Sequence, residues 1–172
     1  MNRITSAFAA ASCSLVLMFA AAPEAAAQTE NVTTYRDWAV TCQTRPDTGT
    51  TECEMSQIIY ADAAQTQRAL MVVVGYAQPN SDPGMLLFLP LGISLPPGVF
   101  LQIDQGEPQA VPVERCENDG CVVQLILSPA YLDVLKAGSQ ATVHAHDRQR
   151  RRFTIPVSLL GFTAGLNALS GS

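Results

Sequence analysis

Short runs of β-forming residues, separated by turn-forming residues about every eight to twelve positions, restrict the fold of this chain most strongly. The runs carry β-branched or alternating apolar residues, a pattern typical of strands that bury one face. They occur at Asp37–Gln43, Glu54–Tyr60, Ala69–Ala77, Met85–Leu89, Val99–Asp104, Ala110–Arg115, Cys121–Leu127, Ala141–His146 and Arg152–Val157. The spacing predicts an all-β fold, either a β-sandwich or a partly closed antiparallel barrel.

Two further segments have helical patterns. Ser128 and Pro129 combine an N-cap hydroxyl with a proline in the first turn, and Gly138 ends the segment, so a short helix is expected over 128–137. Apolar residues at steps of three and four over 158–169 predict a C-terminal helix that packs on the core. The alternative is a helix that binds a partner or a membrane surface, but the segment lacks Lys and Arg.

The N-terminal segment has the three-part layout of a secretory signal peptide. Arg3 gives a positive start, residues 7–22 are apolar, and Ala25–Ala27 supply small residues at the expected cleavage site. The apolar stretch is shorter than the roughly 20 residues that span a bilayer. We therefore expect residues 1–27 to be removed, leaving a single β-rich domain over 28–172. Residues 31–33 fit a glycosylation sequon, in what is expected to be a mobile tail.

Four cysteines remain after loss of the leader, which contains Cys13. An even number in an oxidising compartment predicts two disulfides. Of the three pairings, the local ones, Cys42 with Cys53 and Cys116 with Cys121, are favoured because each encloses turn-forming residues. Each would stabilise a hairpin by about 2–3 kcal/mol. Redox-active thiols are disfavoured because neither spacing is Cys-x-x-Cys, and a zinc site is the remaining alternative.

The longest apolar stretch of the mature chain, Met85–Phe100, contains no charged residue. Proline and glycine interrupt it repeatedly between Pro90 and Gly98, which argues against a membrane-spanning segment. We expect a buried strand, a Pro-rich crossing and a second strand that starts at Val99. An exposed crossing would instead form a hydrophobic ledge for binding.

Positive charge is concentrated at one place in an acidic chain. The net charge of −5 and the pI of about 4.8 argue against a nucleic-acid partner. Four of the ten basic residues nevertheless lie within five positions beside a predicted turn: Arg148, Arg150, Arg151 and Arg152. Such a cluster predicts a site for an anionic lipid headgroup, an anionic glycan or an acidic protein patch. A solvated hairpin tip is the alternative.

Candidates for chemistry are few. His144 and His146 lie two apart in a predicted strand and therefore share a face, where, with Asp147, they would contribute ligands to Zn²⁺ or Cu²⁺. A solvated strand face is the alternative. The sequence has no Gly-x-Ser-x-Gly elbow, no His-Glu-x-x-His pair and no phosphate-binding glycine loop. It therefore predicts no enzyme and no cofactor, with a metal- or carboxylate-dependent hydrolase of envelope material as the less favoured interpretation.

Several segments occur in a distinctive order along most of the mature chain: Asp37–Cys42, Cys53–Met55, Leu89–Val99, Arg115–Cys116 with Asp119–Cys121, and Ile155–Phe162. In this order they resemble the invasion-associated locus B family of exported bacterial proteins. The resemblance implies a Gram-negative protein that is periplasmic, secreted or associated with the outer surface. Some members are linked to host-cell entry, most have no defined activity, and no catalytic residues carry over.

The expected function is therefore a non-catalytic binding module, with an envelope or host protein, an anionic glycan or a lipid headgroup as partner. A structural or stress-related periplasmic protein is the alternative. No transmembrane segment is expected in the mature chain.

Overall fold

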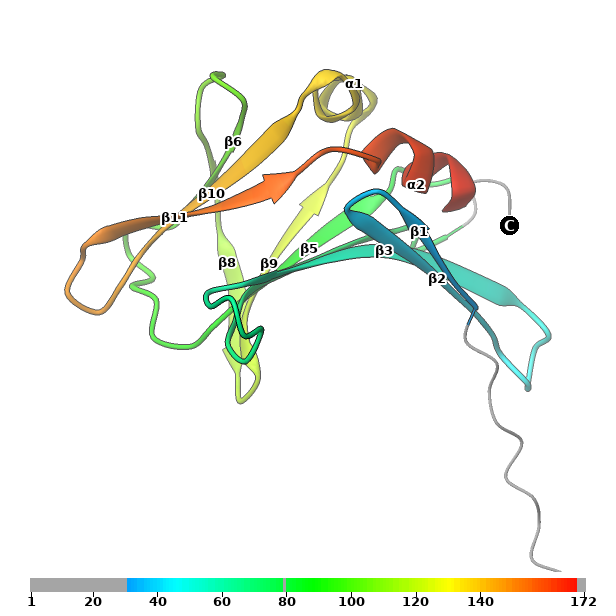
Figure 1. Cartoon of the computed structure of the whole chain (residues 1–172), viewed down its shortest axis with the longest axis horizontal. Coiled ribbons are helices and arrows are strands. Elements are labelled where there is room, and N and C mark those ends of the chain that lie inside the picture. The colour runs from blue at the N-terminus through cyan, green and yellow to red at the C-terminus, as the bar shows by residue number, and fades with distance from the viewer. Residues whose placement is uncertain (1–30, 79, 170–172) are drawn as a thin grey trace, which may run out of the picture.

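The computed structural model describes residues 31–78 and 80–169 (Figure 1). The expected signal peptide, 1–27, lies outside the described residues. The elements are β1 (Asn31–Tyr35), β2 (Trp38–Thr44), β3 (Thr51–Tyr60), β4 (Arg68–Gly75), β5 (Gly84–Leu89), β6 (Val99–Ile103), β7 (Gln109–Val111), β8 (Val113–Glu117), β9 (Gly120–Ile126), α1 (Pro129–Ala137), β10 (Gln140–His146), β11 (Arg152–Ser158) and α2 (Phe162–Leu169). The predicted all-β class with two short helices is confirmed.

The strands form two antiparallel sheets. The large sheet has seven strands in the order β1-β2-β3-β4-β5-β9-β8, and the small sheet has four in the order β11-β10-β6-β7. In Figure 1 the small sheet lies over one part of the large sheet, while α2 lies over the part formed by β1–β3. Two separate layers correspond to the expected sandwich rather than to a barrel.

The core lies between these layers because alternate residues of each strand point inward. Trp38 and Phe162 close the core beneath α2, with ring centroids 5.3 Å apart and an edge-to-face angle of 76°. The indole Nε1 of Trp38 donates a hydrogen bond of 3.0 Å to the Ser158 carbonyl oxygen, so its polar atom is satisfied. Phe162 therefore anchors the last helix to the large sheet.

Both predicted disulfides are confirmed, and each joins residues that face each other on neighbouring strands. Cys42 is bonded to Cys53 across β2 and β3, and Cys116 to Cys121 across β8 and β9. The start of α1 is also as expected: the Ser128 hydroxyl accepts a hydrogen bond from the Tyr131 amide.

The C-terminal helix starts later than predicted. Ser158 is the last residue of β11, paired with Gln140, and α2 begins at Phe162. Gly161 has φ +93°, and a Cβ there would lie 2.0 Å from the Tyr35 carbonyl oxygen. This close approach fixes a turn that only glycine allows, so the helix begins after it.

Two predictions were wrong, one of a strand and one of a tail. The single strand expected over Ala110–Arg115 is divided at Pro112 into β7 of the small sheet and β8 of the large sheet. Proline cannot donate a ladder hydrogen bond, so the chain crosses between sheets there. The expected mobile tail at 31–33 is part of β1, which pairs with β2 through a tight turn in which Arg36 has φ +54°.

Candidate functional site

The Pro-rich loop, residues 90–98, and the arginine hairpin, residues 146–152, meet at one end of the molecule. The Ser94 amide donates a hydrogen bond of 2.8 Å to the His146 carbonyl oxygen. Gly92 has φ +94°, and a Cβ at this position would lie 3.1 Å from Nε of Arg148. The two segments that the sequence marked separately therefore form one surface, called here the loop–hairpin surface.

The Pro-rich loop presents apolar side chains to solvent. Leu91 and Leu95 are 55% and 50% exposed, whereas Ile93 between them packs against the core. The flanking strands β5 and β6 are buried as expected, but at these two leucines the crossing has the character of the alternative, an exposed ledge. Exposed leucines on a loop that the core anchors at Ile93 are available for contact with a partner.

Asp147 organises the tip of the arginine hairpin. Its Oδ1 accepts hydrogen bonds from the amides of Gln149 and Arg151, at 2.8 and 2.9 Å, and its Oδ2 accepts one of 2.7 Å from Nε of Arg151. The amide of Arg151 and its side chain, together with the amide of Gln149, hold the pKa of Asp147 below its ordinary value. The carboxylate thus closes the turn and offsets one of the four arginine charges.

The four arginines have different environments. Arg151 pairs with Asp147, and Arg152 donates from Nη2 to His144 Nδ1 at 2.7 Å. Arg148 lies against Gly92, and Arg150 sits in the turn with φ +60°. Within the part of the chain that the structure describes, neither Arg148 nor Arg150 has a carboxylate within ion-pair distance. The cationic character of the surface therefore comes mainly from these two residues.

His144 belongs to a polar chain on the outer face of the small sheet. Its Nε2 lies 2.8 Å from Oε1 of Gln102, whose own Nε2 donates to the Gly106 carbonyl oxygen. Because arginine only donates, Arg152 assigns the ring proton to Nε2 and makes His144 a neutral acceptor at Nδ1. Burial, and then the charge of Arg152, lower the pKa of His144. The residue is 5% exposed.

The two histidines share a face as predicted, but they are used differently. Both ring nitrogens of His144 are occupied, whereas Nδ1 of His146 is buried and has no hydrogen-bond partner among the described residues. Across 31–78 and 80–169, no group of three or more His, Cys, Asp and Glu side chains is placed to hold a metal ion. The metal hypothesis stays a prediction.

An apolar cleft of about 400 Å³ opens beside the Pro-rich loop, between the β3–β4 end of the large sheet and β11. Tyr60, Pro90, Phe153 and Pro156 contribute to its walls. The described residues also contain no helix long and apolar enough to cross a membrane. The loop, the cleft and the hairpin therefore give this end of the molecule both apolar and cationic contact groups.

Sequence reasoning missed Gln102 and Gly92 at this surface. Gln102 comes to His144 only because β6 pairs with β10, and Gly92 comes to Arg148 only when the loop folds back on the hairpin. Neither contact has a local signal, since the partners are more than forty residues apart. The juxtaposition of loop and hairpin is a property of the sheet order.

Comparisons with known proteins identify the family. A family model described as "Invasion associated locus B (IalB) protein" matches residues 38–170. Two invasion protein B homologs, from Brucella abortus strain 2308 and from biovar 1 strain 9-941, are 30% identical over 138 residues, which is 79% of this chain and 77% of theirs. A crystal structure of invasion associated protein b from Bartonella henselae has the same fold, with a TM-score of 0.69, 24% identity and coverage of 82% and 95% of the two chains. The chain belongs to the invasion associated locus B family.

Proposed function

We propose that this protein is an exported, non-catalytic binding module that recognises an anionic partner through the loop–hairpin surface. One observation carries the proposal: the loop that bears exposed Leu91 and Leu95 contacts the arginine hairpin through Gly92 and Ser94, and Arg148 and Arg150 of that hairpin have no carboxylate partner among the described residues. Guanidinium groups bind phosphate and carboxylate in bidentate geometry, and neighbouring apolar side chains add affinity for amphiphilic partners.

Export is supported by the covalent structure. Two disulfides, Cys42–Cys53 and Cys116–Cys121, fit a compartment outside the cytoplasm. Together with the signal peptide that the sequence predicts, they favour the periplasm or the outer surface of a Gram-negative cell. The names of the relatives refer to invasion, so a host-cell surface with the same anionic chemistry is a natural extension of the proposal.

A non-catalytic role is supported by how the polar groups of this surface are used. His144 is bound on both ring nitrogens, and Asp147 accepts three hydrogen bonds that close the hairpin. A general acid or base needs a site from which it can exchange a proton with a substrate. These side chains instead hold the surface in shape, as expected for a binding module.

Co-sedimentation with vesicles at low salt tests the proposal. We expect binding to phosphatidylglycerol vesicles and none to phosphatidylcholine vesicles. Each basic residue near an anionic surface contributes about 1 kcal/mol, so Arg150→Glu with Arg151→Glu should weaken binding at least about tenfold. Arg45→Glu, which changes an exposed arginine of the β2–β3 hairpin, is the matched control and should have little effect. Unchanged binding of the double variant would overturn the proposal.

Two further arms identify the source of the anionic group and the contribution of the loop. Competition by a soluble phosphorylated glycan, at concentrations where inorganic phosphate has no effect, would identify a glycan rather than a lipid. Leu91→Ser with Leu95→Ser should weaken vesicle binding severalfold while retaining its salt dependence. If the protein binds neither vesicles nor glycan, the structural or stress-related envelope role replaces the binding module.

A further inference from the structure

The outer face of the large sheet, which points away from the small sheet, carries an apolar patch. Its members are Ile58, Met71, Val73, Leu86, Phe88 and Val122, called here the outer patch. Ile58, Met71, Phe88 and Val122 pair side by side in one row across β3, β4, β5 and β9. Their neighbours along the strands point into the core instead.

The sequences of the central strands are those of strands that are covered on both faces. Leu70–Val74 and Met85–Leu89 are continuous apolar runs, whereas a strand with one solvated face alternates apolar and polar residues. On the outer side, Val73 and Val122 are only 8% and 6% exposed and belong to a layer separate from the main core. Both helices of the described chain lie on the opposite side of this sheet (Figure 1). This pattern indicates that a partner covers the outer patch.

We propose that this partner is a second copy of the chain, related by a two-fold axis. Among the described residues, the one basic side chain that lines the hollow of the outer patch, Arg68, lies beside Tyr60 at one end, where Asp119 is also near. Glu54 lies beside Gly75 at the other end. A two-fold axis in the interface that reverses the strand direction brings Arg68 of each copy to Glu54 of the other. The patch is therefore complementary to itself, as an isologous interface requires.

Local geometry favours this arrangement. Arg68 Nη1 lies 3.9 Å from Sδ of Met71, so the guanidinium lies along the patch. Arg68, Glu54 and four patch residues line one shallow hollow of about 560 Å³. Gly75 and Gly84 pair beside Glu54, so no side chain from these two positions covers this end of the patch. A bilayer with anionic headgroups is disfavoured because Glu54 and Asp119 border the same hollow.

The size of the outer patch sets the expected affinity. Four strands about 4.8 Å apart, over about six residues of about 3.4 Å each, give roughly 400 Å² per copy. Interfaces that bury less than about 1,200 Å² in total are typical of weak, transient complexes. We therefore expect a dimer that dissociates in the micromolar range.

Sedimentation equilibrium of the disulfide-bonded protein, from about 1 μM to about 500 μM, measures this dimer directly. The mass should double with concentration, and Leu86→Glu should weaken association at least about tenfold because it buries a carboxylate in the interface. Val134→Glu changes a half-exposed apolar position on α1, outside the outer patch, and should not alter association. A monomer at all concentrations, or a dimer that tolerates Leu86→Glu, would overturn the proposal.

Exchanging the two charges tests the two-fold arrangement, and recovery in the double variant separates loss of the interface from misfolding. Arg68→Glu and Glu54→Arg should each weaken the dimer, because each places like charges together at both ends of the interface. The double variant restores opposite charges and should recover association to within about threefold, since exposed ion pairs contribute little beyond this. A double variant as weak as the single ones would overturn the pairing of Arg68 with Glu54.

Discussion

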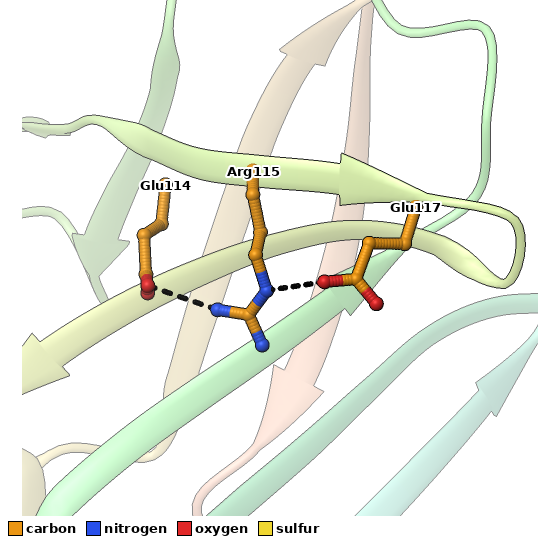
Figure 2. A network of polar contacts seen from close by, with 3 residues as sticks. All are labelled: Glu114, Arg115 and Glu117. Atoms are coloured by element: carbon orange, nitrogen blue, oxygen red, sulfur yellow. Dashed lines mark hydrogen bonds and ion pairs between the residues drawn. The ribbon is translucent and has the colours of Figure 1, made fainter.

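Two of the hairpins that carry arginine in this protein, the β8–β9 hairpin and the arginine hairpin, use it in opposite ways. In the β8–β9 hairpin, Arg115 lies between two glutamates: Nη1 is 2.9 Å from Oε1 of Glu114, and Nε is 2.7 Å from Oε1 of Glu117 (Figure 2). The hydrogen bond to Glu117, and then the charge of Glu114, raise the pKa of Arg115. The arginine hairpin has four arginines, and among the described residues only one carboxylate, Asp147, pairs with any of these four.

The difference follows from what each hairpin contacts. β8 is an edge strand of the large sheet, and charges along an edge discourage pairing with another chain. Arg115, Glu114 and Glu117 are such charges, and Arg115 pairs with both glutamates. β11 is also an edge strand, of the small sheet, but the turn between β10 and β11 folds against the Pro-rich loop. The same residue type protects an edge in one hairpin and presents positive charge in the other.

The largest effects should come from removing the disulfides, one of which lies in the β8–β9 hairpin, whereas the arginine hairpin has none. Cys116→Ser with Cys121→Ser removes a short covalent loop and should lower the free energy of unfolding by about 2 kcal/mol, measured by urea denaturation. Vesicle binding should persist, because Asp147 and His144 hold the arginine hairpin without a disulfide.

The second disulfide serves as the control for loop length. Cys42→Ser with Cys53→Ser opens a longer loop and should cost about 3 kcal/mol in the chain-entropy picture. If removal of the β8–β9 disulfide abolished vesicle binding in a folded protein, the two hairpins would not be independent.

A charge reversal in each hairpin should separate stability from binding. Arg115→Glu places a third carboxylate beside Glu114 and Glu117, so the melting temperature should fall while vesicle binding is retained. Arg150→Glu should leave the melting temperature nearly unchanged and weaken vesicle binding, because no carboxylate of the described chain pairs with Arg150. The same response from both variants would contradict the contrast between the hairpins.

The parts of the fold that depend on neighbouring residues could be predicted from the sequence. The turn-forming residues between Cys116 and Cys121 bring the two strands together, so this disulfide could be predicted from the sequence. The start of α1 at Ser128 and Pro129 was equally local. In contrast, the break at Pro112 and the turn at Gly161 depend on which sheet or strand the chain meets next, which local patterns do not contain.

The candidate site shows the same division. The sequence identified the arginines of the hairpin and the apolar Pro-rich loop, but it did not bring them together. Their contact, from Ser94 to His146 and from Gly92 to Arg148, depends on long-range pairing of the small sheet. The use of Arg152 to bind His144 also depends on the register of β10 with β11. The sequence thus predicted which residues form the site, but it did not predict which of the arginines bind other residues of the chain and which remain without a carboxylate partner among the described residues.

A smaller effect should appear as a pH dependence that only the arginine hairpin shows. Burial and Arg152 lower the pKa of His144 below its ordinary value of 6.5, so the unfolded chain binds a proton that the folded chain does not. The stabilisation is therefore present above about pH 6.5 and decreases as the pH falls toward the pKa of the folded state.

His144→Gln provides the measurement, because glutamine still offers an acceptor to Arg152 but does not titrate. Urea denaturation between about pH 7 and about pH 5 should give a smaller slope for His144→Gln than for the unmodified protein. This window lies above the range in which Asp147 titrates, since the pKa of that carboxyl is lowered from its ordinary value of 3.8. Equal slopes would show that His144 does not contribute to the pH dependence.

The smallest effect should come from Asp147. Its pairing with Arg151 is the one feature of the arginine hairpin that resembles the pairing of Arg115 with glutamates in the β8–β9 hairpin. Asp147→Asn keeps an oxygen that accepts hydrogen bonds from the Gln149 and Arg151 amides, but it removes the negative charge that offsets Arg151. One unit of charge near an anionic surface is worth about 1 kcal/mol, so vesicle binding should strengthen about threefold to fivefold at low salt. The gain should disappear at high salt, because screening removes the contribution of exposed charges. Weaker binding at low salt would mean that the position of the Arg151 guanidinium, set by Asp147, matters more to the partner than the net charge of the hairpin.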